Sequence, residues 1–220
     1  MTITPAILPE NFEQLHDSLF RVEGLTHRVQ IDLCDGRMGL EKTWLPYKET
    51  ELPEGFEYEF DLMVEDWIKF LPRVLSLGAK RVIMHIDTWE EHDFDMLYDI
   101  LSHHPRVSLG LSVTNSGSIE MLVKRVLEAE KRHSKLFVQL MGINKIGAQG
   151  QPFDERVLAR IEHVRRSCRG IPIQIDGSMN PETIFLVKRS GATGVVIGSY
   201  IFGSNNIRKT IDTLHLNFGD

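Results

Sequence analysis

The chain has 220 residues and a net charge of −6, with 42% hydrophobic and 25% charged residues. This length suits one α/β domain covering residues 1–220, and the composition excludes a disordered or membrane-embedded protein. No apolar run reaches the ~18–20 residues that cross a bilayer, and no Lys/Arg block would attract nucleic acid or an anionic membrane. We therefore expect a cytoplasmic protein that binds neither.

Short apolar segments alternate with longer amphipathic ones along the whole chain, which is typical of parallel strands joined by helices. Strands are predicted near Ile3–Leu8, Arg28–Leu33, Glu57–Met63, Arg81–Ile86, Arg106–Ser112, Lys135–Met141, Ile171–Asp176 and Thr193–Gly198. Helices are predicted over Asn11–Val22, Asp66–Leu77, Glu91–Leu101, Ser116–Glu130, Asp154–Ser167, Pro181–Arg189 and Ser204–Leu214.

Eight such strands favour a single (β/α)₈ TIM barrel. The alternative is an open doubly wound sheet, but the glycine fingerprint of dinucleotide-binding sheets is absent after the first strand, which runs into Pro9.

Two connections are irregular. The segment Gly39–Phe56 has no helical period, and Gly142–Phe153 is rich in glycine, which favours a lid or ligand loop over a plain surface loop.

Polar residues alternate with apolar ones in several predicted strands, although the strands of a covered barrel are usually apolar. Asp32, Asp61 and Asp176 fall near the carboxyl ends of three different strands, which converge on one cavity in a barrel. Any one of these aspartates taken alone could equally well have a structural role, capping a loop or pairing with an arginine. Three carboxylates in one cavity repel one another unless a cation or ligand lies between them. His85 is expected to be a hydrogen-bonded wall residue rather than a ligand.

Glycine and serine follow the last two predicted strands, just before helix starts. These residues are Gly177, Ser178, Gly198 and Ser199. Glycine admits a ligand close to the backbone, helix N-termini attract anions, and barrels commonly hold phosphate in these two loops. The loops are predicted to bind phosphate, with ordinary strand-end turns as the alternative.

Six segments carry a resemblance to a known family: ITPAILPENF at 3–12, VQIDLCDG at 29–36, DLMVE at 61–65, GAQGQPF at 147–153, DGSMN at 176–180 and GSYIFG at 198–203. In these segments the sequence resembles the ribulose-phosphate 3-epimerase family of barrels. The resemblance implies epimerisation of a ketose phosphate through an enediolate, with Asp32 and Asp176 as the general acid and base. It also implies a divalent metal, and Gly147 and Gly150 in a loop that binds the substrate.

The chain departs from the family pattern at the metal site, because Gln30 and Asp61 stand where the family has its two histidine ligands. The remaining set, Asp32, Asp61 and Asp176, offers only oxygen and favours Mg²⁺ or Mn²⁺ over Zn²⁺ if a metal binds. Met63 replaces the lysine of related barrel decarboxylases. The predicted function is therefore an epimerase. A non-catalytic sugar-phosphate binder and a different enolate-type lyase are the alternatives, and the oligomeric state, a homo-oligomer included, is left open.

Overall fold

Eight strands rich in Val, Ile and Leu pair in parallel and close into a barrel in chain order, which confirms the (β/α)₈ prediction. The computed structural model describes residues 1–37, 41–47, 50–144, 146 and 150–219. The strands are β1 (Thr2–Ile7), β2 (Arg28–Cys34), β3 (Glu57–Met63), β4 (Arg81–His85), β5 (Ser108–Val113), β6 (Leu136–Met141), β7 (Ile173–Asp176) and β8 (Gly194–Ile197). Because β1 pairs with both β2 and β8, the sheet has no free edge and the open-sheet alternative is excluded.

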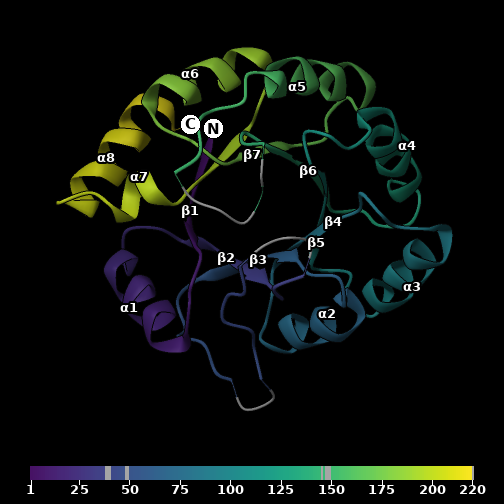
Figure 1. Cartoon of the computed structure of the whole chain (residues 1–220), viewed down its shortest axis with the longest axis horizontal. Helices are drawn as coiled ribbons and strands as arrows, with labels where there is room; N and C mark the ends of the chain where they lie inside the picture. The colour runs from purple at the N-terminus through teal and green to yellow at the C-terminus, as the bar shows by residue number, and fades with distance from the viewer. Residues whose placement is uncertain (38–40, 48–49, 145, 147–149, 220) are drawn as a thin grey trace.

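Helices form an outer ring around the strands (Figure 1). They are α1 (Phe12–Val22), α2 (Trp67–Ser76), α3 (Glu91–Ser102), α4 (Ile119–Ala129), α5 (Arg156–Ser167), α6 (Pro181–Ser190), α7 (Ser199–Phe202) and α8 (Ile207–Phe218). Side chains cap several N-termini; Asn180 accepts from the backbone N–H groups of Glu182 and Thr183. Among the described helices, none combines the length and apolar character that would cross a bilayer.

The predicted elements differ from the observed ones mainly at their ends. The last helix begins at Ile207 rather than Ser204, because the Asn206 side chain accepts from the Lys209 N–H and so caps it there. The short helix α7 was not predicted, since four residues are too few to show a helical period. Strand β5 begins at Ser108 rather than Arg106, because the N–H of Val107 bonds the His104 carbonyl in a turn after α3.

The connection between β2 and β3 contains no helix in its described part, as the sequence predicted, and it runs between α1 and α2 (Figure 1). It is anchored to the carboxyl ends of the first two strands. The Trp44 N–H donates to the Pro9 carbonyl at 2.7 Å, and the Thr43 hydroxyl accepts from the Cys34 N–H at 2.8 Å.

Alternation along the strands separates an apolar outer face, which packs under the helices, from an inner face that carries polar residues in β2, β3, β6 and β7. The strand register places inner residues side by side across neighbouring strands. Gln30 lies beside Glu59 and Asp32 beside Asp61 on β2 and β3, while Gln139 lies beside Gln174 on β6 and β7. The polar residues that alternate in the sequence therefore meet inside one barrel.

Candidate active site

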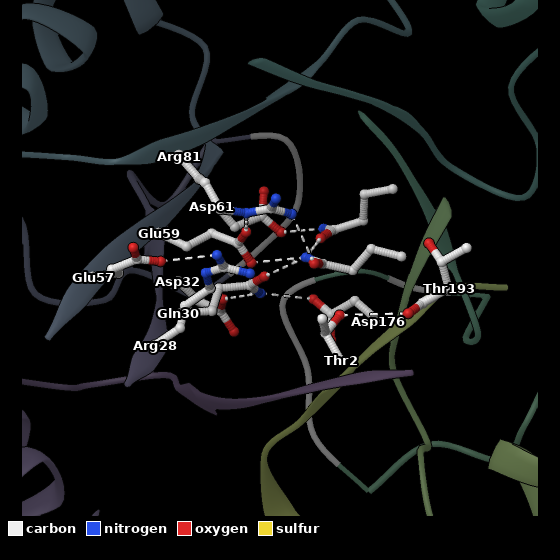
Figure 2. A network of polar contacts seen from close by, with 12 residues as sticks. Thr2, Arg28, Gln30, Asp32, Glu57, Glu59, Asp61, Arg81, Asp176 and Thr193 are labelled. Carbon is white, nitrogen blue, oxygen red and sulfur yellow. Dashed lines mark hydrogen bonds and ion pairs between the residues drawn. The ribbon is translucent and has the colours of Figure 1, made fainter. Parts of the chain in front are cut away.

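Three aspartates from strands distant in the sequence meet at the carboxyl end of the barrel. Asp32 lies near the end of β2, Asp61 lies beside it on β3, and Asp176 is the last residue of β7. One carboxylate oxygen of each lies within 4.8 Å of the other two. The structure thus brings together the three carboxylates that the sequence placed at one end of the barrel (Figure 2).

Gln30 bridges two of these aspartates from below. Its Nε2 donates to Asp32 Oδ1 at 2.8 Å and to Asp176 Oδ2 at 3.0 Å, and its side chain is fully buried. One amide therefore holds both carboxyls in place, although β1 and β8 lie between β2 and β7 in the closed sheet (Figure 2).

Asp61 is fully buried and has partners on both oxygens. Its Oδ1 lies 2.8 Å from His85 Nε2, and its Oδ2 accepts from Gln139 Nε2 at 2.8 Å. Burial opposes protonation of His85, but the negative charge of Asp61 and the hydrogen bond outweigh it and raise the pKa of the imidazole. The hydrogen bond of His85 agrees with the expectation from the sequence.

The two carboxyls that share Gln30 are harder to ionise than free aspartates. Burial, followed by the charges of Asp176 and Asp61, raises the pKa of Asp32 well above its ordinary value. Burial and the charge of Asp61 raise the pKa of Asp176 to about 7, while the hydrogen bond from Gln30 acts in the opposite direction. Both carboxyls are therefore easier to protonate than an ordinary aspartate.

Asp32 and Asp176 line a cavity of about 410 Å³ that opens at the carboxyl end of the barrel. The candidate substrate-binding residues that line the same cavity are Gly150, Gly177, Ser178, Gly198 and Ser199. Gly147, the remaining candidate, lies outside the described residues. Asp32, Asp176 and the glycine loops thus face one space.

The turn after β7 has an unusual backbone that requires glycine. Gly177 has φ +101° and Ser178 has φ +56°, both in the left-handed region. A Cβ on Gly177 would lie 2.7 Å from a side-chain carbon of Ile143 in the loop after β6. The Ser178 hydroxyl donates to the Gln151 carbonyl, which ties the β7 turn to the glycine loop. These contacts bring the two loops together at the cavity mouth.

The three aspartates also fit a divalent cation. They supply carboxylate oxygens alone, the donor set that hard cations prefer, and a cation would relieve the repulsion that raises the pKa of Asp32 and Asp176. The acidic triad could therefore hold a divalent metal.

Sequence reasoning missed two groups of residues at this site. Apolar side chains of Leu8, Met63, Met141, Ile143 and Phe153 line the cavity together with Asp32 and Asp176. Arg81, at the start of β4, pairs with the buried Glu59 carboxylate beneath the triad. The signal for Arg81 was available, since it shares the two-residue alternation of Ile83 and His85 on its strand.

Fold and site together define a class: a (β/α)₈ barrel with an acidic cluster at the carboxyl ends of its strands, the face where barrel enzymes carry their active sites. The profile of the ribulose-phosphate 3 epimerase family matches residues 2–202. The chain belongs to this family.

Individual relatives match over nearly the full length. The chain is 26% identical over 224 residues to ribulose-phosphate 3-epimerase from Bacillus subtilis, covering 96% of this chain and 97% of that one. It is 27% identical over 220 residues to ribulose-phosphate 3-epimerase from Helicobacter pylori strain J99, covering 97% and 96%.

Solved structures share the fold at lower identity. A 3-hexulose-6-phosphate synthase has 17% identity and a TM-score of 0.68, with 99% of both chains covered. A 3-keto-L-gulonate-6-phosphate decarboxylase from Vibrio cholerae has 12% identity and a TM-score of 0.68, with 98% of this chain and 96% of that one covered. At these identities the likeness concerns the fold.

Proposed function

We propose that this protein epimerises a ketose phosphate at the carbon next to its carbonyl, with Asp32 and Asp176 as the acid–base pair. The observation that carries the proposal is that both carboxyls, held by the single amide of Gln30, line the cavity that also contains the glycine loops. The relatives named above are ribulose-phosphate 3-epimerases, so ribulose 5-phosphate is the first substrate to test.

The reaction needs one base and one acid at the same carbon. One carboxylate removes the proton next to the carbonyl and leaves an enediolate, and the protonated partner returns a proton to the opposite face, which inverts the centre. The raised pKa of Asp32 and of Asp176 supports this division, because burial and the crowding of the carboxyls favour the protonated form that the acid must have.

Asp32, Asp61 and Asp176 would hold the divalent cation, with Mg²⁺ or Mn²⁺ favoured over Zn²⁺ because all ligands are oxygen. A bound cation supplies stabilisation of the negative charge that develops on the substrate oxygen. Gly177, Ser178, Gly198 and Ser199 would bind the phosphate, with Gly147 and Gly150 in the loop that covers the substrate. Phosphate at that end places the sugar carbons toward the aspartates.

The test is deuterium exchange into ribulose 5-phosphate in D₂O, followed by NMR, with Mg²⁺, Mn²⁺, Zn²⁺ or a chelator. We expect exchange with Mg²⁺ or Mn²⁺ and a loss of at least about 10³-fold in Asp176→Asn, since the acid–base partner is removed. Asp35→Asn is the matched control. Its carboxylate follows β2 but accepts from the Arg37 and Glu65 N–H groups instead of lining the cavity. Absence of exchange with every metal would contradict the epimerase.

A second candidate, a non-catalytic sugar-phosphate binder, is favoured by Gln30 and Asp61, which stand where the family has histidine ligands. Calorimetric titration with ribulose 5-phosphate separates the two functions. Binding without exchange under any metal supports the binder, whereas exchange that depends on Asp176 excludes it.

A further inference from the structure

A buried polar layer lies beneath the three aspartates, and the proposed chemistry assigns it no role. Glu59 is fully buried and forms an ion pair with Arg81 (Figure 2). The Arg81 guanidinium lies 3.6 Å from the centre of the Phe137 ring. Gln174, also buried, contacts both members of this pair. A carboxylate as deeply buried as Glu59 is costly to keep charged, so the partners that stabilise it need a physical explanation.

The ion pair leaves the Gln174 amide only one orientation. Arginine can only donate hydrogen bonds, and a carboxylate paired with it can only accept them. Arg81 Nη2 donates to Gln174 Oε1 at 3.0 Å, and Gln174 Nε2 donates to Glu59 Oε1 at 2.7 Å. Reversing this amide would set its N–H₂ group against the guanidinium and its carbonyl against the carboxylate.

The orientation of the Gln174 amide determines the orientation of two further amides, those of Gln30 and Gln139. Gln174 Nε2 also lies 3.0 Å from Gln139 Oε1 and 3.3 Å from Gln30 Oε1, so its two N–H groups are shared among Glu59 and these two carbonyls. Both carbonyls are therefore turned down toward Gln174, and both N–H₂ groups are turned up toward the aspartates. Gln30 reaches Asp32 and Asp176, and Gln139 reaches Asp61, as described above.

We propose that Arg81, Glu59 and Gln174 are positioning residues that fix the polarity of Gln30 and Gln139, so that the active site presents N–H donors to all three aspartates. Gln30 then does not replace the family's histidine as a metal ligand, because its oxygen is held by Gln174. It aligns the two carboxyls instead. The inference rests on the proposed function only for its kinetic consequence, since the amide orientation is a property of the protein alone.

The variant that tests the amide orientation most directly is the double exchange Glu59→Gln with Gln174→Glu. It preserves composition, volume and a carboxylate for Arg81, but the residue at position 174 can then only accept, so Gln30 and Gln139 must turn their N–H₂ groups down toward it. Glu59→Gln alone, which removes the obligatory acceptor, is the second variant. Ser112→Ala is the matched control, because this buried inner residue of β5 has no hydrogen-bond partner for its hydroxyl among the described residues.

The first measurement is the ¹H–¹⁵N NMR spectrum of the side-chain amides in metal-free protein. The variants Gln30→Met and Gln139→Met each remove one side-chain amide and so assign its signal. We expect the Gln30 and Gln139 signals to move in both exchange variants and to stay in place in Ser112→Ala. The second is Mn²⁺ binding by electron paramagnetic resonance. Turning Gln30 Oε1 toward the triad adds an oxygen ligand and should tighten Mn²⁺ binding in the double exchange by about tenfold.

If the protein is an epimerase, kcat should fall by at least about tenfold in the double exchange while KM changes less than about threefold, since acid–base alignment is lost and the phosphate loops are untouched. Unchanged amide signals and unchanged Mn²⁺ affinity in a folded double exchange would overturn the inference. Both readouts are independent of turnover, so they decide this point even if the epimerase proposal fails.

Discussion

Asp176 is held by the fold in an environment that opposes its own ionisation. Burial and the charge of Asp61 raise its pKa to about 7. A carboxyl with a raised folded-state pKa stabilises the protein below its unfolded pKa, and this contribution is lost as the pH rises through the folded value. Asp176→Asn should therefore be more stable than the wild type at pH 8 in chelator, by on the order of 2 kcal/mol, and the difference should vanish near pH 4.

Urea unfolding of both proteins between pH 4 and pH 8 measures this difference. Saturating Mn²⁺ is the control, because a cation bound to the ionised triad stabilises the wild type in proportion to its binding and should reverse the order at pH 8. A stability difference that does not change with pH would show that ionisation of Asp176 is not its cause.

The metal preference that we propose for the site can also be tested at single residues. Gln30 and Asp61 supply an amide and a carboxylate where the family has two imidazoles, so the double variant Gln30→His with Asp61→His should favour Zn²⁺. We expect the ratio of Zn²⁺ to Mn²⁺ affinity to rise by about 10²-fold or more, measured by competition titration. An unchanged ratio would mean that these two positions do not face the bound ion.

At the scale of elements, the turn between β7 and α6 determines the shape of the proposed phosphate site. An alanine at position 177 would have to adopt a left-handed backbone, and its Cβ would lie 2.7 Å from a side-chain carbon of Ile143. We expect Gly177→Ala to lower the free energy of unfolding by about 1–3 kcal/mol and to raise KM for the sugar phosphate. Urea unfolding and steady-state kinetics measure the two effects.

Gly24→Ala is the matched control for this turn. Gly24 also has a positive φ, +65°, but no atom lies within 4 Å of the position of its Cβ. The Gly24→Ala variant should lose only the free energy that alanine costs at a positive φ, and its KM should be unchanged. Equal losses in both variants would show that the contact between the β7 turn and Ile143 does not shape the site.

At the scale of the whole molecule, the features that could be predicted from the sequence are those that local patterns determine. Alternation within β2 was enough to place Gln30 and Asp32 on one face, and eight repeats of strand and helix were enough to predict closure. The hydrogen bonds that orient the site were not predictable in this way. Gln30 and Gln174 are 144 residues apart and meet only across the closed barrel, so no spacing in the chain indicates their contact.

The barrel interior below the site depends on a similar contact that a local pattern does not reveal. Gly110 on β5 lies beside Phe137 on β6, and a Cβ on Gly110 would lie 2.4 Å from the tip of the Phe137 ring. Gly110→Ala should therefore overpack the barrel and cost about 1–3 kcal/mol. Phe137→Leu alone should cost a similar amount, because it leaves a cavity of its own and removes the ring that contacts Arg81.

The double variant tests whether these two positions share one space. If they do, the smaller side chain at position 137 admits the added methyl group, and the combined loss should be smaller than the sum of the single losses by at least about 1 kcal/mol. Urea unfolding of the four proteins measures this coupling. Additive losses would mean that strain at Gly110 is relieved elsewhere in the barrel, and the ring would then not be what requires glycine on β5.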